Sequence, residues 1–265
     1  MHSFRPDPNH APAIPASVAA RDLGDLPEWN LADLYPAMDS PEFAADMVRA
    51  QEQCAAFAKT WRGTLEEASR APDAADKLYA AIREYEDIED RLGRLMSYAG
   101  LVYSGDTTDP TRAKFYGDTQ ERLTTASSDL LFFALEMNRL DDATIDALLD
   151  KPPLDHFRPW IEDLRKDKPF QLDDRIEQLF HEKSVTGRSA WNRLFDETIA
   201  SLRFEVRGEE LAIEPTLNKM QDTDETVRRD AAQALTKTFR ANLRTFALIT
   251  NTLTKDKEIS DRWRG

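Results

Sequence analysis

An apolar stripe at helical spacing opens the part of the chain that carries secondary-structure signals. Six residues follow one another at alternating steps of four and three: Phe43, Met47, Ala50, Cys54, Phe57 and Trp61. This spacing places them on one face of an α-helix, and that face has to pack against other helices. Ser40 and Pro41 offer a hydroxyl N-cap and a ring already fixed at helical φ, so the helix is expected to begin there. Because Cys54 lies on the stripe, it is interpreted as a small core residue and not as a nucleophile.

The composition agrees with a helical protein. Only nine of the 265 residues are glycine, and glycine supplies the positive-φ positions that tight turns need, so long helices and few turns are expected. The length allows one large domain or two ordinary ones, at roughly 100–200 residues per domain. With 35 Lys and Arg against 49 Asp and Glu, the net charge is −14, which disfavours nucleic acid as a partner because phosphate contacts require clustered basic residues. A single cysteine excludes an intramolecular disulfide framework and a four-cysteine zinc site.

The first residues predict a tail and not a targeting segment. No stretch is apolar for the roughly 18–20 residues that cross a bilayer, so no membrane association is expected. Residues 1–25 contain four prolines and no basic segment followed by an uninterrupted apolar core, and they are interpreted as a disordered Pro-rich tail. Together with the single cysteine, this pattern favours a cytoplasmic location.

Helical periodicity covers most of the remaining chain. A second helix is expected over 73–103, a third from Asp109 and Pro110 towards Met137, a short one over 142–149, and three more over 156–166, 172–184 and 187–202. Alternating residues around Gly208, with Ile213 in the second strand, predict a β-hairpin near 203–214. One long final helix is expected after a cap at Asp222. The predicted fold is therefore mainly α, an antiparallel helical bundle or array with one small hairpin.

No complete catalytic motif is present. His181-Glu182 opens the His-Glu-x-x-His pattern of zinc proteases, but Val185 stands where the second histidine should be, so a structural role is expected for His181. His156 has no helical histidine partner and is also interpreted as structural. Ser189 lies in GRSAW, which lacks the second glycine of a nucleophile elbow, and is expected in the first turn of a helix. No catalytic, cofactor-binding or metal-binding residue is therefore assigned.

Charged pairs and clusters have ordinary explanations. Asp141-Asp142 and Asp173-Asp174 fall where helices are expected to begin, and acidic residues there complement the helix dipole. The basic cluster 165–168, with Lys183 and Arg188 further on, falls near a predicted helix end, where cations are favourable. An anion site at this cluster is the less favoured reading.

Several longer segments resemble the N-terminal part of oligoendopeptidase F, in the thimet-oligopeptidase-like group of zinc metallopeptidases. The resemblance rests on WNLADLYP, LMSYAGLVYSGDTTDP and LLFFALEMNRL, and most strongly on the run from FRPWIEDLRKDKPF to SLRFEV. It continues through EPTLNKMQD and FRANLRTFALITNTLTKDKEISDRWRG. These segments cover most of residues 28–265.

The resemblance implies a largely helical cytoplasmic enzyme that hydrolyses short peptides in a deep channel. It also implies one zinc ion, whose ligands in that family lie in a C-terminal half that this sequence does not contain. It divides the chain into an N-terminal helical scaffold (26–110), an oligopeptidase N-terminal domain (111–185) and the beginning of the catalytic domain (186–265).

Three hypotheses follow. The first is an N-terminal piece of such a peptidase, inactive alone, whose partners are oligopeptide substrates and the missing catalytic half. The second is a stand-alone, non-catalytic helical module that binds peptides or a protein, and the third is a hydrolase with an unrecognised site. The first hypothesis predicts uncovered apolar surface on the helix that bears Phe239, Phe246 and Ile249.

Overall fold

A computed structural model describes residues 29–265 of the chain. Within these residues the chain forms twelve α-helices, two short 3-10 helices and one antiparallel pair of strands. The predicted mainly α fold with a single small hairpin is therefore confirmed. The predicted tail, residues 1–25, lies outside the described residues. Of the helices described, none combines the length and the apolar character that crossing a membrane requires.

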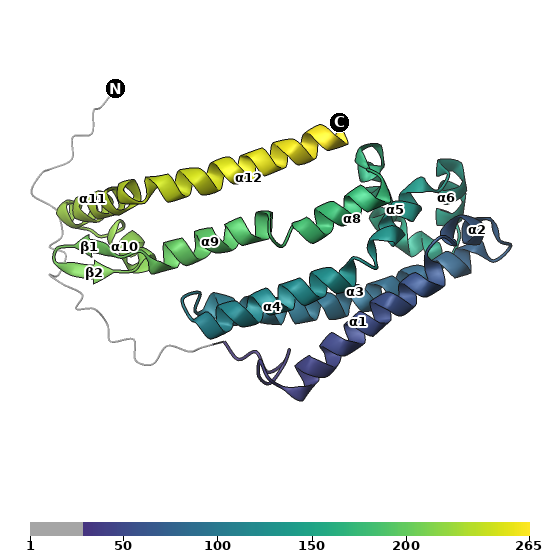
Figure 1. Cartoon of the computed structure of the whole chain (residues 1–265), viewed down its shortest axis with the longest axis horizontal. Coiled ribbons are helices and arrows are strands. Elements are labelled where there is room, and N and C mark those ends of the chain that lie inside the picture. The colour runs from purple at the N-terminus through teal and green to yellow at the C-terminus, as the bar shows by residue number, and fades with distance from the viewer. Residues whose placement is uncertain (1–28) are drawn as a thin grey trace, which may run out of the picture.

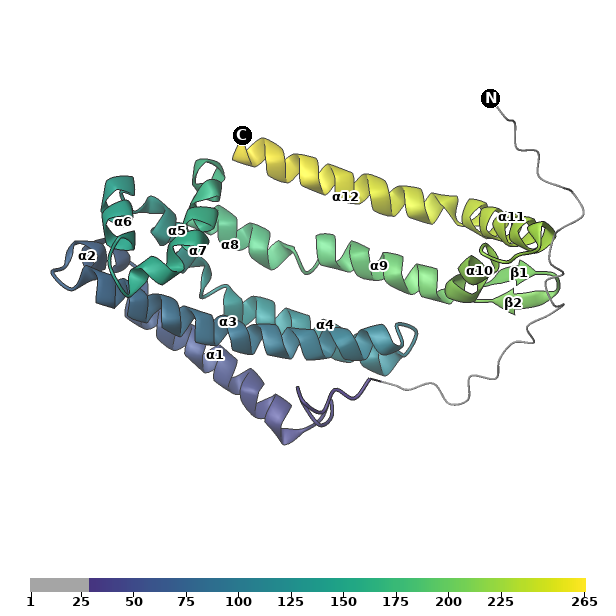
Figure 2. The same ribbon diagram turned by 180° about the vertical axis from the view of Figure 1, so that it is seen from behind.

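Three long helices form the first layer: α1 (Pro41–Trp61), α3 (Ala74–Gly105) and α4 (Pro110–Ser127). α3 packs against both of the others, and the three run side by side in Figures 1 and 2. The predicted start of α1 is confirmed, because the Ser40 hydroxyl accepts a hydrogen bond from the Phe43 amide at 3.3 Å. Asp109 caps α4 in the same way, with its carboxylate 2.7 Å from the Thr111 amide.

Short helices close one end of this layer. They are α2 (Leu65–Arg70), α5 (Leu131–Arg139), α6 (Asp142–Leu149), η1 (Leu154–Phe157), α7 (Arg158–Leu164) and η2 (Arg165–Phe170). Phe133 of α5 is fully buried there. Its ring stacks on Tyr85 with the centroids 4.8 Å apart and meets Phe57 edge-on at 5.2 Å. These rings fasten the closed end to α1 and α3.

The second layer begins at α8 (Asp174–Lys183) and α9 (Arg188–Ser201). The hairpin of β1 (Phe204–Val206) and β2 (Glu209–Leu211) follows, and then α10 (Ile213–Lys219), α11 (Glu225–Ala241) and α12 (Leu243–Arg264). In both views α9 lies between α12 on one side and α3 and α4 on the other. Arg207 and Gly208 form the hairpin turn with φ values of 54° and 84°, the positive pair that suits the twist of two short antiparallel strands.

The buried apolar residues form two separate clusters. The larger one extends from Tyr35 to Ile161 and unites the first layer with the short helices. The smaller one is centred on four residues of the hairpin region and α11, namely Leu202, Phe204, Val206 and Ala234. The described part of the chain therefore has a main core and a small second core, and α8 and α9 connect them.

The prediction of one continuous third helix, from Asp109 towards Met137, is wrong. The chain turns at residues 128–130 and divides it into α4 and α5. The hydroxyls of Ser127 and Ser128 both donate to the Thr124 carbonyl, at 3.3 and 3.0 Å. Such side-chain bonds give the backbone an alternative to continuing the helix.

The C-terminal prediction is also corrected. Ile213 begins α10 and is not part of the second strand. Asp224, not Asp222, caps the next helix, with its carboxylate 2.8 Å from the Thr226 amide. That helix ends at Asn242, whose side-chain amide donates to the Thr238 carbonyl at 3.0 Å, so the predicted single helix is the pair α11 and α12.

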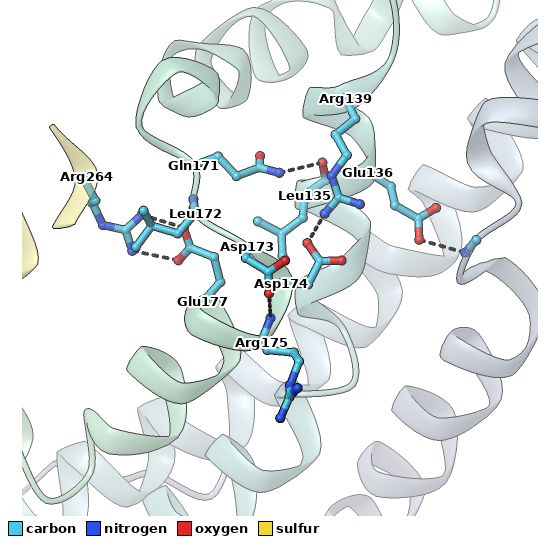
Figure 3. A network of polar contacts seen from close by, with 11 residues as sticks. Leu135, Glu136, Arg139, Gln171, Leu172, Asp173, Asp174, Arg175, Glu177 and Arg264 are labelled. Atoms are coloured by element: carbon cyan, nitrogen blue, oxygen red, sulfur yellow. Dashed lines mark hydrogen bonds and ion pairs between the residues drawn. The ribbon is translucent and has the colours of Figure 1, made fainter.

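An ion pair fastens the far end of α12 to α8 (Figure 3). Arg264 donates to both carboxylate oxygens of Glu177, at 2.6 and 2.7 Å, and to the Phe170 carbonyl at 3.1 Å. The Leu172 amide donates to the same carboxylate at 2.9 Å. Burial alone would raise the pKa of Glu177, but the hydrogen bonds from Arg264 and Leu172 and the guanidinium charge lower it below its ordinary value.

The core prediction concerns Phe133. Replacing it with alanine removes a fully buried ring, and the free energy of unfolding should fall by about 3–5 kcal/mol. Phe170, whose residue is 48% exposed, is the matched control, and F170A should cost less than about 1 kcal/mol. Urea unfolding followed by circular dichroism measures both. Equal losses would contradict the assignment of Phe133 to the core.

A second prediction concerns the pH dependence of the Glu177–Arg264 pair. Since the folded pKa is depressed, the pair stabilises the fold fully above the unfolded pKa of Glu177 and loses this effect as the pH falls through the folded value. E177Q should therefore lower the free energy of unfolding by about 1–2 kcal/mol at pH 7. The difference from the unmodified chain should shrink on acidification from pH 5 to pH 3. E121Q, at an exposed position on α4, is the control, and a deficit of E177Q that stayed constant over this range would contradict the account.

Candidate functional site

A cleft runs from the space between the two layers into the second layer, and its two ends have different linings. The end next to α3 and α4 is a cavity of about 460 Å³. Its lining comes from α3 and the turn after it (Gly100, Tyr103, Ser104, Thr107), from α4 (Tyr116) and from α9 and α10 (Phe195, Asp196, Ile199, Ala200, Ile213). Residues about a hundred positions apart in the sequence therefore share one cavity.

Two tyrosines form the aromatic wall of this cavity. The rings of Tyr103 and Tyr116 stack with centroids 4.9 Å apart and an interplanar angle of 13°. Tyr103 is only 5% exposed, and its hydroxyl is buried without a hydrogen-bond partner. Burial and the nearby charges of Glu197 and Asp196 raise the pKa of Tyr103 to about 12, so it stays neutral at physiological pH.

A carboxylate stands at the rim of the same cavity. Asp196 lies on α9 and, within residues 29–265, makes no hydrogen bond or ion pair through its side chain. The residue is exposed overall, yet partial burial of its carboxyl raises the pKa. An unpaired carboxylate beside aromatic rings is an arrangement suited to a cation.

The other end of the cleft is open and mostly apolar, and Arg240 is the one charged residue of its lining. A groove of about 670 Å³ shares Phe195, Ile199 and Ile213 with the cavity and continues along α11 and α12. Phe246 meets Phe195 and Phe239 with the ring centroids 5.9 Å apart in each pair. The remaining apolar lining comes from Leu235 and Leu243. The two ends are therefore continuous through α9 and α10.

The expected uncovered surface on the final helix is found in part. Phe239 and Phe246 are half-buried and line the groove, and Leu243 and Leu248 are 62% and 56% exposed. Ile249 is only 3% exposed, so its predicted exposure is wrong. Ile249 belongs to α12, and α12 packs against α9.

His181 takes part in contacts between helices. Its Nε2 atom lies 2.9 Å from the Ser127 hydroxyl and 3.2 Å from the Thr124 carbonyl oxygen, so it connects α8 to the end of α4. Among the described residues, no set of three His, Cys, Asp or Glu side chains is placed to hold a metal ion.

The other candidate residues lie apart from the cleft. His156 is exposed in η1, with its ring edge-on to Phe157 at 5.1 Å. Ser189 lies in the first turn of α9, as predicted. Cys54 is fully buried in the main core, as predicted, and burial raises the pKa of its thiol to about 12.

The acidic pairs begin helices, as predicted. Asp141 caps α6 through the Thr144 amide at 2.9 Å, and Asp173 caps α8 through the Arg175 amide at 3.0 Å. Their neighbours form ion pairs: Asp142 with Arg165 and Lys168, and Asp174 with Arg139.

The basic side chains of residues 165–168 form hydrogen bonds and ion pairs with other residues of the chain. Arg165 donates to the Met137 and Leu140 carbonyls at the end of α5, at 2.6 and 2.8 Å. Lys166 pairs with Asp163 at 2.7 Å, and Lys168 pairs with Asp142 at the same distance. The cluster thus closes a helix end and leaves little positive charge for an anion.

Sequence reasoning did not find the residues of the cleft. Tyr103, Tyr116, Asp196 and Phe195 belong to no compact motif, and their helices meet only in the folded chain. One sequence signal was available: the large apolar residues Leu194 and Phe195 stand directly before Asp196. In the structure they are 40% and 44% exposed. Such exposure on an otherwise amphipathic helix indicates a surface that is not part of the core.

Comparisons with known proteins agree on one family. The family model described as Oligopeptidase F matches residues 136–204. Oligopeptidase PepF of Bacillus subtilis is 25% identical over 236 residues, which cover 86% of this chain and 34% of that protein. Group B oligopeptidase PepB of Streptococcus agalactiae is 25% identical over 183 residues, 66% of this chain and 30% of that protein.

The fold is also shared. The crystal structure of oligoendopeptidase-F from Enterococcus faecium superposes with a TM-score of 0.71 at 21% identity, over 84% of this chain and 44% of that one. The chain spans about a third of the length of the two sequence relatives. The family model and the two relatives bear out the resemblance of this chain to an N-terminal portion of oligoendopeptidase F, and the superposition shows that the fold is shared.

Proposed function

We propose that this chain is the scaffold and one wall of the substrate channel in a zinc metalloendopeptidase of the oligoendopeptidase F type. The whole protein would hydrolyse peptide bonds in short peptides, and these 265 residues alone would be inactive. The observation that carries the proposal is the similarity to PepF, which extends over 86% of the chain. The cleft beside α3, α4 and α9 supports it, because a channel wall needs side chains that are accessible to a substrate and not buried in the core.

Residues 29–265 do not contain a complete ligand set for the zinc ion of this proposal. No three potential ligands converge there, and His181 contacts Ser127 and Thr124. The described residues therefore do not fit the metal, and no step of peptide hydrolysis is assigned to them. Their contribution is to bind and orient the peptide.

The expected division at 26–110, 111–185 and 186–265 stays a prediction, as does a cytoplasmic location. The separation of the main core from the second core supports a change of unit in the region of α8 and α9. The lone, buried Cys54 fits a reducing compartment.

A cleavage assay tests the proposed function. The 265-residue chain should not cleave a quenched fluorescent heptapeptide with or without added Zn²⁺. A protein expressed from the same reading frame continued beyond Gly265 should cleave it and lose activity with a chelator. A His-Glu-x-x-His sequence is expected in that continuation. Zinc-dependent turnover by the 265 residues alone, or a reading frame that stops directly after Gly265, would contradict the proposal.

The alternative is a non-catalytic helical module that binds peptides or a partner protein. The open apolar groove along α11 and α12 is the observation that favours it. The same assay separates the two functions, because the module would bind peptide saturably while no extension of the frame restores cleavage.

A further inference from the structure

We propose that the cleft selects peptides carrying a positively charged group next to large apolar side chains, with Asp196 and the Tyr103–Tyr116 pair as the residues that determine this preference. The inference rests on the proposed function, since it assigns the substrate class of the cleft. It concerns binding alone and involves no chemical step.

Charge and aromatic surface at the end of the cleft that the tyrosines line fit a cation. Asp196 brings a carboxylate that no described side chain pairs with, and the stacked tyrosine rings present π-surface in the same cavity. A Lys ammonium or an Arg guanidinium gains both from a nearby carboxylate and from an aromatic face. A second carboxylate, Glu197, lies close enough to influence the charge state of Tyr103.

The hydroxyl of Tyr103 is an independent indication of a ligand. Tyr103 lines the cavity and is only 5% exposed, and its hydroxyl oxygen has no hydrogen-bond partner. Leaving a buried polar group unpaired is unfavourable. The ammonium or guanidinium of a bound peptide would supply the missing donor.

One positive charge of the chain, on Arg193, lies near enough to Tyr103 to act on its pKa, which it lowers against the larger effect of burial. The Arg193 guanidinium lies against Gly117 of α4, with its Nη1 atom 2.8 Å from the position a β-carbon would take. Glycine at 117 leaves the space that this contact needs. Arg193 forms no ion pair with Asp196, so the carboxylate at the rim stays available.

The apolar groove defines the rest of the ligand. Phe195, Ile199 and Ile213 belong to both the cavity and the groove. A peptide whose charged group reaches the tyrosines can therefore lay its neighbouring side chains against Phe239 and Phe246. Short peptides with both features should bind better than purely apolar ones.

Titration calorimetry of the 265-residue chain tests the inference. Three hexapeptides are compared: a fully blocked acetyl-Ala-Phe-Lys-Leu-Phe-Ala-amide, the same peptide with norleucine for lysine, and the norleucine peptide with a free amino terminus. The lysine peptide should bind about tenfold more tightly than the blocked norleucine peptide, which corresponds to one cation contact of about 1.4 kcal/mol. A gain only with the free amino terminus would assign the cation to the peptide N-terminus and would equally support a cation site.

The variants identify the residues. D196N should abolish the preference for the charged peptide and leave the affinity for the norleucine peptide unchanged. Y103F should weaken the preference while being at least as stable to urea as the unmodified chain, because the buried hydroxyl it loses has no partner. D256N, which removes an exposed carboxylate of α12, should change neither affinity.

Three results would overturn the inference: equal binding of all three peptides, a charge preference that survives D196N, or no binding of any peptide. None of them decides the proposed function. Cleavage by the longer protein is measured separately and can succeed or fail whatever the charge preference.

Discussion

The buried stripe of α3 is the constraint on which the rest of the structure depends. This helix has 32 residues, about 48 Å at 1.5 Å per residue, and its buried side chains continue from Ala74 to Tyr103. A single helix gains most of its stability from packing such a face. α1 and α4 cover this one along its length, and α2, α6 and η1 complete it at one end. The same helix then delivers Tyr103 to the cleft at its other end.

The second layer is built with less burial, and this difference creates the site. α8 and α9 have no fully buried residue. α9 instead lies between α12 and the first layer with its apolar side chains half-covered, so Phe195 and Ile199 can face the cleft. The hairpin core at one end and the Arg264–Glu177 pair at the other hold this layer in place. Apolar surface that is not buried in the core can bind a ligand or another part of the protein.

Much of the fold follows from periodicity and capping. The stripe of α1, the cap at Ser40, the length of α3 and the helix over 142–149 could all be predicted, because each depends on residues within one or two turns. The errors lie where a side chain competes with the helix locally. Ser128 and Asn242 interrupt helices whose apolar spacing continues across the break.

The cleft could not be predicted in the same way. Tyr103 and Asp196 share a cavity only because α3 and α9 are brought together by packing over long sequence separations. The histidines and paired carboxylates of the sequence are more conspicuous, but in the structure His181 connects two helices, and Asp141 and Asp173 begin helices. The proposed function therefore rests on the resemblance of long segments to oligoendopeptidase F and not on any compact catalytic motif.

The central claim is that α3 and α9 form two sides of one binding cleft. Hydrogen–deuterium exchange with and without the blocked lysine hexapeptide tests it most directly. The peptide should slow exchange around Tyr103, around Asp196 and at the start of α10 together, while exchange in the main core around Phe133 should not change. Protection confined to one layer, or spread over the main core instead, would contradict it.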